Sequence, residues 1–262
     1  MPILKVLQLT DLHILPHAGD KMLGIDTEQY FQEALAHAHA THGPFDLILL
    51  TGDLGQDPSA DSYRRICKHL QTYQTPCLCL PGNHDDWELM ETELNVGFVS
   101  CRKHLLLKNW QIIALNSQKP GSPAGFVSQE ELVFLQQTLS TNDMPVLLAV
   151  HHHCVASGSS WMDTMQIENG EALLAIAERF VQVKAITCGH LHQEMQTNHE
   201  QIAIFATPAS CFQFKPFATE FELDSLAPGY RVFELGDDGD LRSRCYRLPI
   251  SMNDLQTNLH SY

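Results

Sequence analysis

The sequence has no apolar run approaching the roughly 20 residues of a membrane span. Basic residues are scarce: 16 Lys and Arg stand against 31 Asp and Glu, which gives a formal net charge of -15. A membrane-embedded protein and an extended surface for nucleic acid or anionic membrane are therefore not expected. Internal repeats and linkers are also lacking. We predict a single domain over residues 1–262, with 213–262 as a C-terminal extension that packs on a sheet or extends it.

Paired cysteines are lacking as well. The eight Cys have no Cys-x-x-Cys spacing, which argues against a zinc ribbon. The chain enters a strand pattern at Ile3, and Asp11 follows too closely for a signal peptide. We therefore expect a cytoplasmic protein with reduced thiols.

What the sequence does contain is a regular alternation of apolar runs and helical patterns. Strands are predicted at 3–9, 45–50, 77–80, 110–115, 145–150, 183–188, 201–207, 230–235 and 241–248. Helices are predicted after the caps Asp26 and Ser128, over 63–73, at 89–94 and at 171–180. This alternation favours an α/β fold with a mainly parallel sheet covered on both faces. Ligand sites in such sheets lie at the C-terminal ends of the strands.

Five polar clusters occur where predicted strands end. They are Asp11/His13, Asp53, Asn83/His84, His151 in the run of three His at 151–153, and His190/His192. On an extended backbone, Asp-x-His and His-x-His place two side chains on one side. Adjacent residues such as Asn83 and His84 leave it in different directions, so one can bind metal while the other faces substrate. Each cluster taken alone also fits a turn or a polar loop. The five together, with oxygen and imidazole donors and no thiolate, describe a two-metal site for iron, manganese or zinc.

These motifs as a set resemble the signature of the calcineurin-like metallophosphoesterases: Asp-x-His, Gly-Asp, Gly-Asn-His-Asp, a strand-terminal His and Gly-His-x-His. Further stretches resemble the bacterial class III 3′,5′-cyclic-AMP phosphodiesterases within that family. They are the sequences at 23–24, 54–57, 160–163, 192–194, 213–216 and 227–230. The resemblance spans nearly the whole chain and implies two packed mixed β-sheets flanked by helices.

The resemblance also implies a ligand set. One metal would be held by Asp11, His13, Asp53 and His192, and the other by Asp53, Asn83, His151 and His190, with Asp53 as the bridge. The substrate would lie against His13, Asp53, Asn83, His84, His151 and His192. His151 is the first His after its strand and is the one that aligns. Cys154 stands where the family usually has Pro, and Tyr230 where Trp is common.

The implied reaction is hydrolysis of 3′,5′-cyclic AMP to 5′-AMP by in-line attack of a metal-bridging hydroxide. Two divalent or mixed-valence cations ~3.5–4 Å apart would generate the nucleophile and neutralise the phosphoryl oxygens, with iron and manganese favoured and zinc allowed. His84 would protonate the departing ribose oxygen as the catalytic general acid. The expected partner is cyclic AMP, with no nucleic acid or membrane, on a monomer or homodimer.

Other readings compete with this one. The same machinery also fits another phosphodiester or a phosphomonoester, because the metal ligands do not distinguish these substrates. A catalytically silent binding scaffold is disfavoured because no ligand is missing. Metal storage is disfavoured because the donors are spread over several strand ends instead of one tract. Trp161 fits either stacking on adenine or filling the core.

Overall fold

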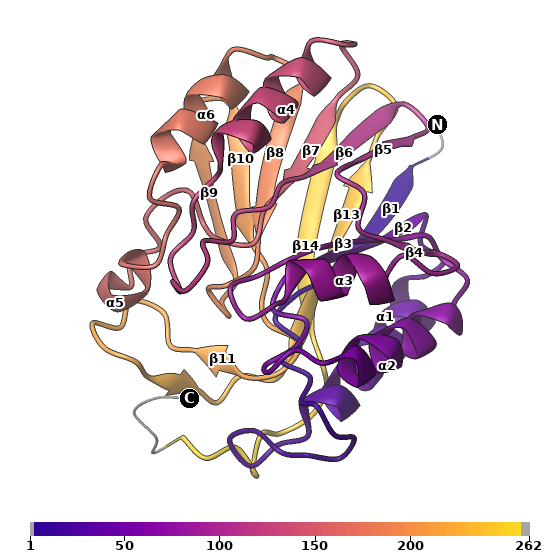
Figure 1. Cartoon of the computed structure of the whole chain (residues 1–262), viewed down its shortest axis with the longest axis vertical. Coiled ribbons are helices and arrows are strands. Elements are labelled where there is room, and N and C mark those ends of the chain that lie inside the picture. Colours follow the sequence, from indigo (N-terminus) through magenta and orange to yellow (C-terminus); the bar gives the residue numbers. More distant parts are fainter. Residues whose placement is uncertain (1–2, 258–262) are drawn as a thin grey trace.

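The computed structural model describes residues 3–257, whose strands form two six-stranded mixed sheets packed face to face (Figure 1). The first sheet has the order β14-β13-β1-β2-β3-β4 and the second β5-β6-β7-β8-β10-β9, while β11 and β12 form a separate pair. The strands are β1 (Leu4–Leu9), β2 (Leu47–Thr51), β3 (Cys77–Leu80), β4 (Val99–Ser100), β5 (His104–Leu107), β6 (Trp110–Ala114), β7 (Val146–Ala149), β8 (Val183–Cys188), β9 (Met195–His199), β10 (Ile202–Ala206), β11 (Gln213–Phe214), β12 (Leu223–Asp224), β13 (Gly229–Leu235) and β14 (Leu241–Arg247).

Helices cover the outer face of each sheet. They are α1 (Thr27–His42), α2 (Ala60–Gln71), α3 (Trp87–Glu93), α4 (Gln129–Leu139), α5 (Ser160–Asp163) and α6 (Gly170–Glu178). α1, α2 and α3 share one apolar cluster with the first sheet, and α4 and α6 share another with the second. Figure 1 shows these two helical layers on opposite sides of the molecule. Within residues 3–257, no helix is long and apolar enough to cross a membrane.

The two mixed sheets that the family resemblance implies are confirmed, and the single mainly parallel sheet is wrong. β1 to β4 are parallel, as are β6, β7, β8 and β10, so each half alone matches the expected pattern. A continuous apolar run shows only that both faces of a strand are covered. It does not say whether the cover is a helix or a second sheet.

The apolar run of β2 packs against the second sheet on one face and against helices on the other. Leu47 and Leu49 point into the core between the sheets, while Ile48 and Leu50 pack against the helices. All five residues of the strand are buried, which explains why the sequence lacks polar alternation here.

Two helix starts follow the predicted caps. The Asp26 side chain accepts a hydrogen bond from the Gln29 backbone N–H at 3.0 Å, and Ser128 accepts from Glu131 at 3.2 Å. The reciprocal half of the predicted capping box at Gln29 is not formed within the described chain, because that side chain donates to Glu33 instead. Gly43 ends α1 as predicted.

The C-terminal part of the described chain contributes two strands to the first sheet. β13 pairs antiparallel with β1, and β14 pairs with β13 at the sheet edge through the predicted hairpin at 236–239. Residues 258–262 of the predicted extension, like residues 1–2, lie outside the described residues.

The core between the sheets makes a testable stability prediction. Phe233 is 0% exposed there, whereas Phe217 is 79% exposed. Phe233→Ala should lower the free energy of unfolding by about 3–5 kcal/mol, because it removes a buried ring and leaves a cavity. The matched control Phe217→Ala should change it by no more than about 0.5 kcal/mol. Urea denaturation checks both, and equal effects would contradict the packing described.

Candidate metal centre

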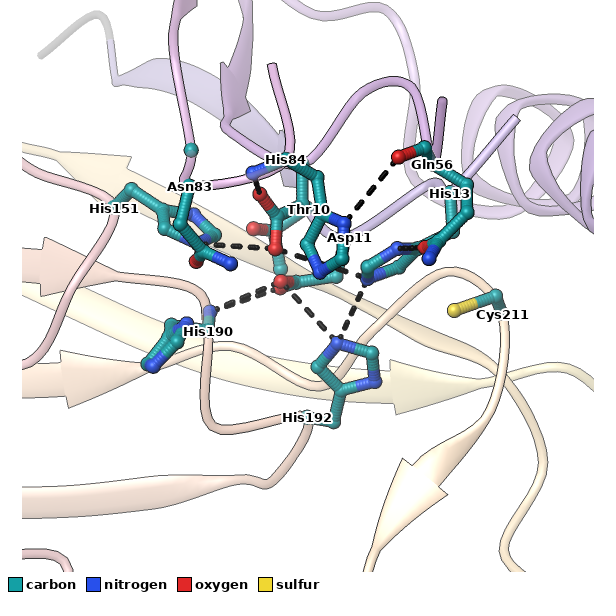
Figure 2. Close-up of polar contacts among 12 residues, drawn as sticks. Thr10, Asp11, His13, Gln56, Asn83, His84, His151, His190, His192 and Cys211 are labelled. Carbon is teal, nitrogen blue, oxygen red and sulfur yellow. Dashed lines mark hydrogen bonds and ion pairs between the residues drawn. The ribbon is translucent and has the colours of Figure 1, made fainter. Parts of the chain in front are cut away.

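The five predicted clusters converge at one edge, where the C-terminal ends of strands from both sheets meet. Asp11 and His13 follow β1, Asp53 follows β2, and Asn83 and His84 follow β3. From the second sheet, His151 follows β7, and His190 and His192 follow β8. Figure 2 labels all of these residues except Asp53 and shows them gathered at this edge. The structure therefore brings together every residue that the sequence nominated.

One half of the site is built around His13 and His192. Their Nε2 atoms lie 3.1 Å apart, and His192 Nε2 lies 3.3 Å from Asp11 Oδ1. His13 Nε2 is 3.8 Å from Asp53 Oδ2. Cys211 also comes near, since its sulfur groups with nitrogens of these two His within 4.8 Å.

The other half is built around His151. Its Nε2 lies 3.3 Å from Asp53 Oδ2 and 3.2 Å from Asn83 Oδ1. Asp53 Oδ2 thus faces both halves of the site. His190 approaches the same half from β8, with its ring centroid 5.1 Å from that of His151, and its backbone N–H donates to both carboxylate oxygens of Asp11.

Hydrogen bonds on the outer ring nitrogens fix which atoms face the centre. The Nδ1 atoms of His151 and His192 contact the backbone carbonyls of Thr51 and Phe212 at 2.8 and 2.9 Å. Carbonyl oxygens only accept, so each Nδ1 carries a proton, and Nε2 is the ring nitrogen left to face the centre and bind a cation. This is the tautomer that a metal-binding His requires.

The inward-facing atoms are mostly acceptors. His151 Nε2, Asn83 Oδ1 and Asp53 Oδ2 converge, and His190 Nε2 is buried without a hydrogen-bond partner among residues 3–257. Converging acceptors repel unless they share positive charge, supplied by a proton on His151 or by a metal cation. The donor set of carboxylate, amide oxygen and imidazole fits transition-metal cations such as iron, manganese or zinc.

The pKa shifts of the clustered residues also indicate that the site requires positive charge. Burial lowers the pKa of His13 to about 3, so its ring is neutral at pH 7 and able to bind a cation. Burial would also lower the pKa of His151, but the adjacent Asp53 carboxylate outweighs it and raises the pKa to about 9. Burial acts to raise the pKa of Asp53, but the positive charge of His151 holds it well below its ordinary value. Without a metal, a proton on His151 partly compensates Asp53.

The backbone conformation of the ligands differs from the one predicted from the sequence. Asp11, His13, Asp53, His190 and His192 all have positive φ, between 46° and 65°. The prediction that the paired ligands lie on one side of an extended strand is therefore wrong. The left-handed backbone conformation of these residues turns their side chains inward instead. Asn83 and His84 likewise sit in a turn. Such conformations cost about 1–3 kcal/mol each and cluster at functional sites, where the surrounding structure maintains them.

Two residues that sequence reasoning left without a role organise the loops. Gln56 Oε1 contacts His13 Nδ1 at 2.6 Å, and its backbone carbonyl accepts from His84 Nδ1 at 3.3 Å. Asp85 accepts backbone N–H bonds from Leu54 and Gly82 at 2.9–3.1 Å. Both lie inside stretches quoted for the family resemblance, which was the available signal.

The other members of the His run also contact residues outside the predicted ligand sets. His152 Nδ1 contacts Ser117 Oγ at 2.8 Å, and His153 Nε2 lies 3.4 Å from Asp163. Trp161 packs edge-on against Phe214, with ring centroids 5.1 Å apart, in the apolar cluster of the second sheet. This contact favours the core-filling alternative for Trp161.

With this fold and this site, the chain belongs to the calcineurin-like phosphoesterase family, whose model matches residues 4–194. Among curated relatives, it is 38% identical to the 3′,5′-cyclic adenosine monophosphate phosphodiesterase CpdA of Haemophilus influenzae, covering 94% of this chain and 91% of that protein. It is 37% identical to CpdA of Escherichia coli K12, covering 93% and 90%. A 3′,5′-cyclic-nucleotide phosphodiesterase of Nostoc is 33% identical, covering 96% and 95%.

Solved structures share the fold at low sequence identity. A dimetal phosphatase from Danio rerio superimposes with a TM-score of 0.63 at 12% identity, covering 94% of this chain and 99% of that one. The GAP50 anchor of the Plasmodium inner membrane complex superimposes with a TM-score of 0.62 at 13% identity, covering 94% and 84%. These likenesses support the fold alone.

Glycines at the ends of two strands allow the close contacts of the site. A Cβ on Gly82 would lie 2.2 Å from Asp53 Oδ1, and one on Gly189 would lie 2.7 Å from Asp11 Oδ2. Side-chain atoms cannot approach carboxylate oxygens this closely, so a substitution must displace the carboxylate.

We therefore predict that Gly82→Ala loses most of its bound metal. The control Gly19→Ala should keep its metal, because no atom lies within 4 Å of the added Cβ, although its φ of +82° costs about 1 kcal/mol of stability. Elemental analysis after reconstitution with Mn²⁺ checks both variants. Full metal content in Gly82→Ala would contradict the contact with Asp53.

Proposed function

We propose that this chain hydrolyses 3′,5′-cyclic AMP to 5′-AMP at a dinuclear metal centre. The observation that carries the proposal is the convergence of the predicted ligands at the meeting edge of the two sheets, where Asp53 Oδ2 lies 3.8 Å from His13 Nε2 and 3.3 Å from His151 Nε2. Figure 2 shows the surrounding ligands. Similarity to the curated CpdA proteins over more than nine-tenths of the chain supports cyclic AMP as the substrate.

The residues divide into two ligand sets around Asp53. Asp11, His13, Asp53 and His192 would hold one cation, and Asp53, Asn83, His151 and His190 would hold the other. When bound, the two cations supply an activated water near neutral pH and positive charge for the phosphoryl oxygens. Burial of the ligands, most of which are 0–6% exposed, keeps bulk water from competing for them.

His84 has a different position from the ligands. Its backbone N–H donates to Asp53 Oδ1 at 2.9 Å, and its ring Nδ1 is held by the Gln56 carbonyl at 3.3 Å. The side chain is only partly buried, unlike the 0%-exposed His13 whose ring centroid lies 5.1 Å away. A partly accessible imidazole beside the metal centre is suited to contact the phosphate and protonate the departing ribose oxygen.

The proposal also covers the cellular compartment, the oligomeric state and the identity of the metals. We place the enzyme in the cytoplasm, where its thiols stay reduced, as a single-domain monomer or homodimer without nucleic-acid or membrane partners. Iron and manganese suit the mixed oxygen and imidazole donors, and zinc is compatible with them.

A substrate panel tests the function. We expect the Mn²⁺-loaded protein to hydrolyse cyclic AMP with a higher kcat/KM than cyclic GMP, 2′,3′-cyclic AMP, an aryl phosphodiester or an aryl phosphomonoester. Preference for another member of the panel would keep the metal chemistry but contradict the substrate. Inactivity on every member, with both metals bound, would favour the silent scaffold.

We predict that His84→Ala keeps both metals but lowers turnover of cyclic AMP by roughly 10²–10⁴-fold, the range expected when general-acid catalysis is lost. Elemental analysis and steady-state kinetics on the same sample separate the two effects. His17→Ala is the control, since His17 is exposed and lies outside the ligand sets. A wild-type rate in His84→Ala would remove this residue from the mechanism.

Asp53→Ala should abolish both metal occupancy and hydrolysis, because the removed carboxylate faces both halves of the site. Asp57→Ala, a nearby exposed carboxylate, should keep both. Metal titration followed by elemental analysis measures the occupancy. Retention of two cations by Asp53→Ala would rule out the bridge.

A further inference from the structure

A fully buried amide joins the two sheets just before the strands reach the metal ligands. Gln8, on β1, is 0% exposed. Its Nε2 donates to Thr51 Oγ1 in its own sheet at 2.8 Å and to the Cys188 carbonyl in the other sheet at 3.3 Å. Its Oε1 accepts from Thr187 Oγ1 at 2.6 Å and from Thr207 Oγ1 at 2.7 Å, both on the side of the second sheet.

The direction of these hydrogen bonds is fixed by chemistry. The Cys188 carbonyl can only accept, so the end of the amide that faces it is the NH₂ group. Arg231, also buried, donates through Nε to Thr207 Oγ1 at 3.2 Å. The Thr207 hydroxyl proton is therefore available for Gln8 Oε1. We call Gln8, Thr51, Thr187, Thr207 and Arg231 the inter-sheet network.

The inter-sheet network reaches the ligands through the backbone. The Thr51 carbonyl accepts from His151 Nδ1 at 2.8 Å, so a residue of the first sheet orients a ligand of the second. Asp53 follows Thr51 by two residues, and His190 follows Cys188 by two. Gln8 thus ties together the strand ends that carry ligands from opposite sheets.

The surroundings make a polar side chain here unexpected on grounds of stability. Around the inter-sheet network, the core between the sheets contains apolar side chains from both sheets. Apolar packing resists separation of the sheets but resists sliding only weakly, because it has no direction. Hydrogen bonds with fixed donors and acceptors hold one register, and fully satisfied buried networks are known to specify a unique arrangement.

We propose that Gln8 is a positioning residue that sets the distance and orientation between the metal ligands of the first sheet and those of the second. The inference rests on the proposed dinuclear site but not on the identity of the substrate. Loss of such an outer contact typically weakens metal affinity or activity by about 10- to 100-fold.

The test compares Gln8→Met with Gln111→Met. Both wild-type side chains are 0% exposed amides on sheet strands, and Met conserves their length. The Gln111 amide bonds Met144 O and His104, near the N-terminal end of β6, where no ligand lies. The readouts are thermal unfolding, Mn²⁺ affinity and the electron paramagnetic resonance spectrum of the Mn²⁺ pair, which reports coupling between the two ions.

We expect both variants to lose stability, and only Gln8→Met to lose Mn²⁺ affinity by about 10-fold or more with an altered pair spectrum. A Gln8→Met protein with wild-type affinity and spectrum overturns the inference. If Gln8→Met does not fold, Thr187→Val removes one donor to Oε1 at nearly constant shape. It must show the same selective change, and a wild-type spectrum there overturns the inference equally.

Failure of the proposed function gives a different result. A wild-type protein that shows the coupled Mn²⁺ pair but does not hydrolyse cyclic AMP contradicts the substrate, while the comparison of the two Gln variants still supports the inference. A wild-type protein that shows no coupled pair overturns the dinuclear site and the inference together.

Discussion

The buried Asp53 carboxylate is the charge around which the strand ends are arranged. It lies at 1% exposure where the two sheets meet, and an isolated carboxylate in such a place would be very costly. The His84 N–H donates to one oxygen, while His13 and His151 face the other from opposite sheets. The protein supplies only part of the positive charge that this carboxylate requires. The other side-chain atoms that converge here are mostly acceptors, which also require a positive partner. A cation pair satisfies both conditions at once.

The buried apolar core stabilises the strained backbone conformations of the metal ligands. Five ligands have left-handed backbone, and two glycines leave room for carboxylates at distances that no side chain tolerates. Three apolar clusters, one between the sheets and one under each helical layer, hold the strands that end in these turns. Function at the edge therefore depends on burial throughout the sandwich.

Strands could be predicted from the sequence where all their residues are buried, and could not where buried and exposed residues alternate without a clear apolar pattern. The run at 47–51 is apolar on both faces, so β2 was predicted within a few residues. β9 alternates half-buried and exposed residues with little apolar content, and it went unpredicted. The second sheet was missed by residue patterns because a covered strand face does not reveal what covers it. Only the family resemblance supplied it.

The site shows the same division. The ligands were found because charged and imidazole side chains after apolar strands are conspicuous. Their left-handed backbone was not foreseen, since Asp and His carry no strong preference for it of the kind that Gly does. The role of Gln8 could not be predicted from the strand pattern at 3–9, because its partners lie 43 to 199 residues away.

Metal titration of the metal-free protein tests the central claim most directly. Mn²⁺ should bind at two per chain, and hydrolysis of cyclic AMP should appear only as the second ion binds, because Asp53 joins two ligand sets into one centre. Activity that saturates with a single bound ion, or that persists with none, would contradict the account.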